Sequence, residues 1–251
     1  MDNFKCFESF EKDGRFSMKK INIGILSCII VVCVMAGFYV ISREPSMKEE
    51  ISSGDRIILP QPRYDSDISI EKALLERRSI RDYKDEPLSL AEVSQLLWAA
   101  QGITDKRGFR TSPSAGALYP LELYVVIGNV EGISKGIYRY NPEEHELIKI
   151  VNGDKRNELC DAALGQLCVK EGAISIVFSA VYERTTKKYG ERGIRYVHME
   201  AGHAAQNIYL QSVSLNLGTT VVGAFNDDEV KKIIKMSDEE HPLYIMPVGR
   251  V

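Results

Sequence analysis

Three arginines and a serine occur within five residues of the sequence, in the segment RRSIR. They are Arg77, Arg78, Ser79 and Arg81. Guanidinium groups and a hydroxyl offer donors at several angles, which is what a phosphate dianion requires. The same arginines could instead complement the negative carboxyl end of a preceding helix. The two interpretations are about equally supported by these residues alone.

A loop of small residues, TSPSAGALYP at 111–120, is a second candidate for ligand contact. Small residues let backbone N–H groups approach a ligand, and prolines keep such a loop rigid. The loop leads into LELYVVIG, whose alternation and β-branched content predict a strand. Taken alone, the loop is more simply an ordinary rigid entry to that strand.

Lys188 and Tyr189 are adjacent in a polar segment, and together they offer a proton donor and acceptor. The alternative is a solvated turn whose lysines keep it soluble. Gly223 and Ala224 follow a β-branched strand, where free backbone donors can meet a ligand acceptor. Arg250, next to the last residue, could supply a further cation or belong to a frayed end.

Other classes of site lack support in the sequence. No CxxC or HExxH motif occurs, and His198 and His203 are five residues apart, so we expect no metal site. We expect Glu200, close to these histidines, to pair with an arginine. No GxGxxG or P-loop motif is present. A net charge of −3 gives no electrostatic footprint for nucleic acid.

The pattern of helices and strands after residue 67 predicts an α+β domain at 68–251. Ser69 or Asp67 could cap a helix through IEKALLERRS, and Ser89 with Glu92 forms a capping box for the next helix. A long helix is expected from about Arg192 to Leu215. The remaining expected elements are strands near 121–127, 136–140, 147–151, 173–181, 219–222 and 243–248, and helices near 154–164 and after Asn226.

The N-terminal quarter of the chain has a different composition. Residues 1–20 show no period and predict a disordered tail, whereas 21–42 contain an uncharged apolar run long enough to cross a bilayer as one helix. Residues 43–67 are charged and predict a tether. Lys19 and Lys20 place the N-terminus in the cytoplasm and the domain outside it. Translation from Met18 would instead make the run start like an export signal.

Five segments in this order closely resemble the SagB-type (ThcOx-type) dehydrogenases of the nitroreductase superfamily. They are RRSIR, SPSAGALYP, KYGERGIRYVHMEAGHAAQN, VVGAF and the terminal PVGR. The resemblance covers about residue 68 to the end. It implies a nitroreductase-like α+β fold with a mixed central sheet flanked by helices, and a homodimer with FMN at the subunit interface.

The resemblance also implies a role for each matching residue. The FMN phosphate and ribityl chain would be held by Arg77, Arg78, Ser79, Arg81 and Arg250. The isoalloxazine ring would be lined by Pro113, Ser114, Ala115 and Gly116, with the backbone of Gly223 and Ala224 at its N5 edge. Lys188 and Tyr189 match the adjacent lysine and tyrosine that carry the proton chemistry in azoline-oxidising relatives.

The function implied is a membrane-anchored, FMN-dependent SagB-type dehydrogenase that oxidises thiazoline- or oxazoline-like groups in a peptide. The first alternative is an NAD(P)H-dependent nitro or quinone reductase, because relatives with the same flavin-binding set reduce such compounds. The second alternative is a non-catalytic module that binds flavin or a partner protein.

Overall fold

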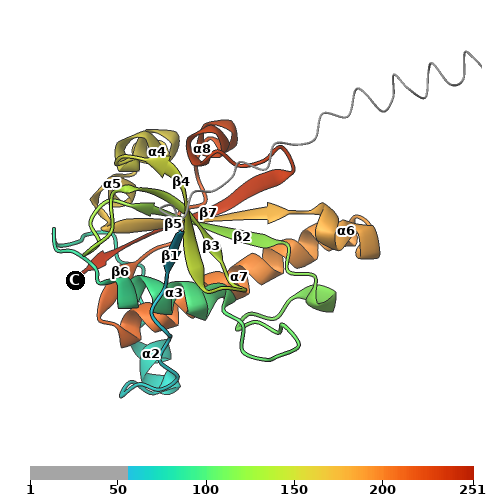
Figure 1. The fold of residues 1–251 in the computed structure, drawn as a ribbon, viewed down its shortest axis with the longest axis horizontal. Helices are drawn as coiled ribbons and strands as arrows, with labels where there is room; N and C mark the ends of the chain where they lie inside the picture. The colour runs from blue at the N-terminus through green and yellow to red at the C-terminus, as the bar shows by residue number, and fades with distance from the viewer. Residues whose placement is uncertain (1–55) are drawn as a thin grey trace, which may run out of the picture. The chain divides into compact units, whose positions relative to one another are not determined.

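A seven-stranded sheet runs through the middle of the part of the chain that the structure describes, residues 56–251 of a computed structural model (Figure 1). The strand order is β1-β4-β3-β2-β5-β7-β6, and these neighbours pair antiparallel. A parallel bridge joins Leu88 to Val130 beside the sheet. The strands are β1 (Arg56–Ile58), β2 (Leu121–Ile127), β3 (Gly136–Asn141), β4 (Glu146–Asn152), β5 (Ile174–Val181), β6 (Leu217–Thr219) and β7 (Glu240–Arg250).

Helices cover both faces of the sheet, which confirms the α+β class (Figure 1). One face carries α2 (Ile70–Glu76), α3 (Leu90–Gln101) and α7 (Arg192–Ser214), and the other carries α4 (Arg156–Ala162), α5 (Leu167–Glu171) and α8 (Asp227–Ile234). The short helix α6 (Glu183–Tyr189) lies at one end of the sheet. Because both faces are covered, the central strand β5 is buried along its whole length.

The helix α7 is the element that spans the face on which the predicted site residues gather. Its side chains at Val197, Ala204 and Ile208 are fully buried against the sheet and α3. Small residues at Ala201 and Ala204 let the helix lie close to the strands beneath it. These two alanines therefore serve the chain's own core, whereas Gly202 between them is exposed.

The expected tether at 43–67 is shorter in the structure, because its last residues belong to the domain. Strand β1 pairs with β4 at the edge of the sheet, and Leu59 after it is 2% exposed in the core. His145 fixes the next residue: its Nε2 lies 2.7 Å from the Ser94 hydroxyl and 3.1 Å from the Pro60 carbonyl. The sequence did not show this strand because three residues carry too little periodicity to predict one.

The predicted membrane location is not upheld by the structure. Within residues 56–251, none of the helices is both long enough and apolar enough to cross a membrane. The predicted tail at 1–20 and the predicted span at 21–42 lie outside the described residues, as does the tether up to residue 55.

Candidate active site

The RRSIR segment follows directly on α2, and a tyrosine of α7 holds it. The Ser79 hydroxyl lies 3.0 Å from the Tyr209 hydroxyl, and the Arg77 guanidinium stacks 5.2 Å above the Tyr209 ring. Arg81 is exposed. Arg78 behaves differently, because its Nη1 donates to the carbonyls of Leu75 and Arg77 at the end of α2. That contact matches the helix-end interpretation for Arg78. In contrast, the side chains of Arg77 and Ser79 contact Tyr209, and Arg81 is exposed.

The same tyrosine connects the RRSIR segment to the VVGAF segment. Its hydroxyl accepts a hydrogen bond of 2.9 Å from the backbone N–H of Val221. Two residues on, Gly223 and Ala224 are exposed, and a Cβ added at Gly223 would meet no atom within 4 Å. The backbone at Gly223 therefore faces open space. We call Arg77, Ser79, Arg81, Tyr209 and Gly223 with Ala224 the arginine cluster.

The SPSAGALYP loop lies against Lys188 and Tyr189, which are about seventy residues away in the sequence. A Cβ added at Gly116 would lie 2.8 Å from the Tyr189 hydroxyl and 2.9 Å from Lys188 Nζ. Lys188 Nζ in turn lies 5.4 Å from the centre of the Tyr189 ring. These residues, with Pro113, Ser114 and Ala115, form what we call the loop cluster.

The backbone of this loop is strained. Gly116, Ala117 and Tyr119 have φ angles of 66°, 53° and 45°, in the left-handed region that side chains disfavour. The Ser114 hydroxyl holds the loop closed by accepting a hydrogen bond of 2.9 Å from the Tyr119 N–H. Strain of this kind gathers at functional sites, where surrounding contacts maintain it.

Glu200 of α7 lies beneath the loop and is 2% exposed. Burial raises the pKa of its carboxyl group to about 7, and opposing effects come from a hydrogen bond with Ser114 and the charge of Arg110. Its Oε1 atom has no hydrogen-bond partner within residues 56–251. A carboxyl group in this state can hold a proton near neutral pH. The expected ion pair of Glu200 with an arginine is not formed within residues 56–251, where Arg110 acts on this carboxyl group only through its charge.

Arg250 is partly buried and forms an ion pair with Glu92. Its two terminal nitrogens donate to both carboxylate oxygens of Glu92, at 2.6 and 2.9 Å. Glu92 also accepts from the Ser89 N–H at 2.8 Å, as the predicted capping box requires. Arg250 therefore ties the last strand to the start of α3, and its guanidinium is only partly available to a ligand.

A single chain keeps the arginine cluster and the loop cluster apart. Tyr189 precedes α7, whose first residue is Arg192, and Tyr209 lies near its far end. At the rise of an α-helix, Arg192 and Tyr209 are separated by about 26 Å along the axis. The predicted residues thus form two groups at opposite ends of α7, rather than one pocket.

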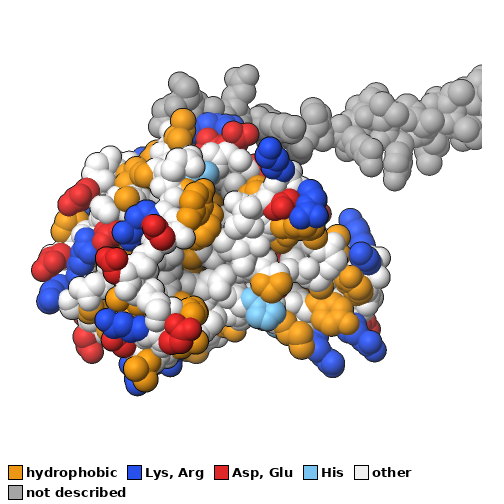
Figure 2. Space-filling model, turned by 90° about the horizontal axis from the view of Figure 1, so that it is seen from below, with side chains coloured by type: hydrophobic (Ala, Val, Ile, Leu, Met, Phe, Trp, Pro, Cys, Tyr) orange, Lys and Arg blue, Asp and Glu red, His pale blue; other side chains and the backbone are white. Residues whose placement is uncertain are grey.

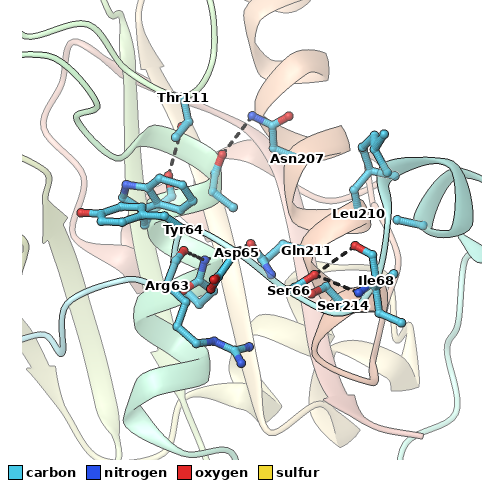
Figure 3. Close-up of a pocket in the computed structure, with 15 residues that line it drawn as sticks. Arg63, Tyr64, Asp65, Ser66, Ile68, Thr111, Asn207, Leu210, Gln211 and Ser214 are labelled. Carbon is cyan, nitrogen blue, oxygen red and sulfur yellow. Dashed lines mark hydrogen bonds between the residues drawn. The ribbon is translucent and has the colours of Figure 1, made fainter.

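A separate cavity of about 340 Å³ opens between the segment 63–70, α3 and α7 (Figure 3). Tyr64 packs edge-on against Trp98 at one wall, with ring centres 5.5 Å apart. Asn207 donates to the Ala99 carbonyl and to the buried Ser112 hydroxyl, next to the loop cluster. Thr111, the first residue of the loop 111–120, lines this cavity, but none of the residues assigned to FMN or to proton transfer does.

Figure 2 shows the face that carries α2, α3 and α7. Hydrophobic side chains reach the surface on this face, and its middle carries few charged side chains. The exposed hydrophobic residues of α2 and α7 are Ile70, Leu74, Leu75, Ile194 and Met199. Contiguous apolar patches mark faces that pack against another protein, and these residues are the ones that such a contact on this face would cover.

Tyr209, Glu200 and Arg110 are the site residues that sequence reasoning missed or left without a role. A tyrosine within an amphipathic helix gives no signal of its own, because the same pattern suits a core residue. Glu200 did give a signal in the helical period, because it stands three residues after Val197 and four before Ala204, both of which are buried. That signal depends on knowing which face of α7 is inside.

The sequence of the chain matches the nitroreductase family over residues 74–250. The chain belongs to the nitroreductase family. It is 49% identical over 197 residues to a protein of Methanocaldococcus jannaschii that is named as a nitroreductase, covering 78% of this chain and 98% of that one. The chain is accordingly an oxidoreductase of this family.

A more distant relative is named for the processing of a microcin. The chain is 27% identical over 172 residues to the microcin B17-processing protein McbC of Escherichia coli, which covers 65% of this chain and 63% of McbC. A solved nitroreductase-type protein of Ralstonia eutropha has the same fold, with a TM-score of 0.70 at 29% identity over 78% of this chain and 90% of its own. In a structure of the Escherichia coli McbBCD complex with truncated pro-MccB17, a chain superposes with a TM-score of 0.61 at 22% identity, covering 94% of this chain and 99% of its own.

Proposed function

We propose that this chain is an FMN-dependent oxidoreductase of SagB type that works as a homodimer. Each flavin would be held by the arginine cluster of one chain and the loop cluster of the other. The observation that supports it most is the contact of Gly116 with Lys188 and Tyr189. It joins the loop that would line the flavin ring to the residue pair that would handle protons. Lys188 and Tyr189 follow Gly116 by about seventy residues, so their contact is produced by the fold and not by closeness in the sequence.

The residues of the two clusters fit a flavin mononucleotide in their chemistry. The arginine cluster offers two guanidiniums and a hydroxyl for a phosphate, and open backbone at Gly223 for a ring edge. The loop cluster offers a small-residue backbone that lets a flat ring approach. When bound, FMN accepts a hydride at its N5 atom.

A homodimer would bring the clusters together. In a two-fold interface, the same surface of each chain meets its equivalent, and an axis that crosses the middle of α7 makes the two α7 helices antiparallel, so that opposite ends become neighbours. The exposed hydrophobic residues of α2 and α7 would be covered in such a dimer. Each dimer would then hold two equivalent flavin sites, each with one cluster from either chain.

Lys188 and Tyr189 would hold and transfer the proton that leaves the substrate. Lys188 Nζ and the Tyr189 hydroxyl each lie within 3 Å of the position of a Cβ added at Gly116, so both can reach a group bound against the loop. Tyr189 is oriented by an edge-on contact with Tyr196, with ring centres 5.3 Å apart. Glu200 beneath the loop would be able to accept and release that proton, because the pKa of its carboxyl group is about 7.

The substrate proposed is a thiazoline or oxazoline group in a peptide, supported by the likeness to a microcin-processing protein. The second candidate is an NAD(P)H-dependent nitro or quinone reductase, favoured by the higher identity to a relative named as a nitroreductase. The two reactions differ in their need for a base at Lys188. A reductase obtains its hydride from nicotinamide and does not take a proton from carbon.

The experiment is to record the absorption spectrum of the purified protein and then titrate it anaerobically with NADPH. A flavin spectrum is expected, and its absence would refute both enzymatic proposals and leave a binding module. Lys188→Ala should abolish azoline oxidation while the flavin stays bound, and Lys187→Ala serves as the matched control on the exposed side of α6. Rapid bleaching by NADPH with full activity in Lys188→Ala would favour the reductase.

A further inference from the structure

A second polar cavity, of about 360 Å³, lies beside the loop cluster at the start of β2 and the end of β3. Besides these two strands, its walls come from the end of α3, the residue before the loop, the β3–β4 turn and the first turn of α6. Three of its lining residues are arginines, namely Arg110, Arg139 and Arg184. No part of the proposed flavin site lines it.

The charges around this cavity leave an excess of one positive charge. Two carboxylates, Glu122 and Glu143, stand against the three guanidiniums. Arg184 is already committed, because it forms an ion pair with Glu122 and donates to the Tyr119 carbonyl at 3.1 Å. Arg110 and Arg139 form no ion pair within residues 56–251.

Arg110 is partly buried and has a hydrogen-bond donor that no protein group among residues 56–251 uses. Its Nη1 donates to Gln101 Oε1 at 2.9 Å, and its guanidinium stacks 4.5 Å above the Tyr119 ring. Its Nε is buried with no hydrogen-bond partner in the described part of the chain. Burial lowers the pKa of this guanidinium, yet an arginine stays charged in a protein. An anion in the cavity would satisfy both the charge and the donor.

The cavity is one helical turn from the proposed proton-transfer pair. Arg184 and Lys188 are at positions i and i+4 of α6, which lie on the same side of a helix. Arg184 also contacts Tyr119, whose N–H closes the loop onto Ser114. A molecule that reacts at Lys188 could therefore extend into the cavity.

We propose that this cavity is a binding site for a carboxylate of the substrate, held by Arg110 and Arg139. The single excess positive charge suits a monoanion, whereas a phosphate dianion would leave net negative charge among the two glutamates. The planar guanidinium forks also match the two oxygens of a carboxylate. The carboxylate belongs either to a peptide C-terminus or to an acidic side chain near the reacting group. The assignment to a substrate rests on the proposed function, while the binding site rests on the cavity alone.

The test is calorimetric titration of the full-length protein with three acetylated dipeptides. They are acetyl-Ala-Ala as the free acid, acetyl-Ala-Ala-amide, and acetyl-Ala-Glu-amide. Binding of the free acid alone assigns a peptide C-terminus, and binding of the glutamate peptide assigns an acidic side chain. Binding of the neutral amide as tightly as the acids overturns the proposal, and so does tighter binding of inorganic phosphate.

Arg139→Gln should weaken binding of the acid about tenfold or more, since one charge-assisted hydrogen bond is lost. Arg107→Gln is the matched control, because Arg107 is an exposed arginine that does not line the cavity. Equal binding by the two variants refutes the site. Flavin absorbance measured on the same samples separates this result from the proposed function, because the dipeptides bind whether or not flavin is present.

Discussion

Replacing Gly116 with alanine tests whether the contact between the loop and the Lys188–Tyr189 pair sets activity. Gly116 has a φ of 66°, so a side chain there carries left-handed strain of roughly 1–2 kcal/mol. The free energy of unfolding should fall by that amount, and Tm by about 2–4 °C for each kcal/mol in a chain of this size. Chemical denaturation and calorimetry measure both.

The effect on activity has a separate origin. The new Cβ would lie 2.8 Å from the Tyr189 hydroxyl and 2.9 Å from Lys188 Nζ, where ordinary contacts are 3.4–4 Å. The two polar ends must therefore move by about 1 Å, a displacement that can cost roughly 100-fold in rate. Turnover of an azoline peptide should drop by about that factor while flavin absorbance is kept.

Gly132→Ala is the matched control. Gly132 has a φ of 73°, and a Cβ there would meet no atom within 4 Å. The control should lose the same stability as Gly116→Ala and keep full activity. Equal activity in the two variants would refute the claim that the loop positions Lys188 and Tyr189.

Three further predictions concern the residues that support the two clusters. Tyr209→Phe removes the partner of Ser79 and leaves the Val221 N–H unpaired, so unfolding free energy should fall by about 1–3 kcal/mol and flavin affinity should weaken in a fluorescence titration. Arg250→Met leaves Glu92 half-buried without its ion pair and should lower Tm, whereas an unchanged Tm would contradict the structural role. Glu200→Gln should flatten the pH dependence of stability between about pH 4.5 and 7. In the native protein, stability falls as pH rises through this window, because the buried carboxyl has a pKa raised to about 7 and folds more readily when protonated.

Much of the fold could be predicted because local signals agree with tertiary packing. The capping box of Ser89 and Glu92 starts α3, and Asn226 caps α8 by accepting from the Glu229 N–H. The apolar run at 121–127 is β2, and the long amphipathic pattern is α7, which ends one residue before the predicted Leu215. These elements carry strong periodicity or a cap, which are the signals that a sequence displays directly.

Other elements are decided by contacts that the sequence does not display. A solvated turn is one of the two interpretations of the polar segment around Lys188 and Tyr189, but residues 183–189 form α6, whose inner side is closed by the buried Thr185. Residues 167–171 form α5, which is too short to show a helical period. The ion pair of Arg250 with Glu92, 158 residues away, is a further contact that the sequence does not display, while the role at the phosphate that the resemblance implies for Arg250 stays a prediction. Long-range ion pairs of this kind depend on register, which single motifs leave open.

We propose above all that each flavin is bound by the arginine cluster of one chain and the loop cluster of another. Two variants test it, Arg81→Ala in the first cluster and Pro113→Trp in the second, at two exposed positions. Each variant alone should be free of flavin, because both sites of its homodimer are broken.

The decisive measurement is the flavin content of a mixed dimer refolded or co-expressed from these two variants and purified through two different tags. One of its two sites receives both substitutions and the other receives neither, so we predict one flavin for each mixed dimer. A mixed dimer without flavin would contradict the shared site and would place all contacts of a flavin within one chain.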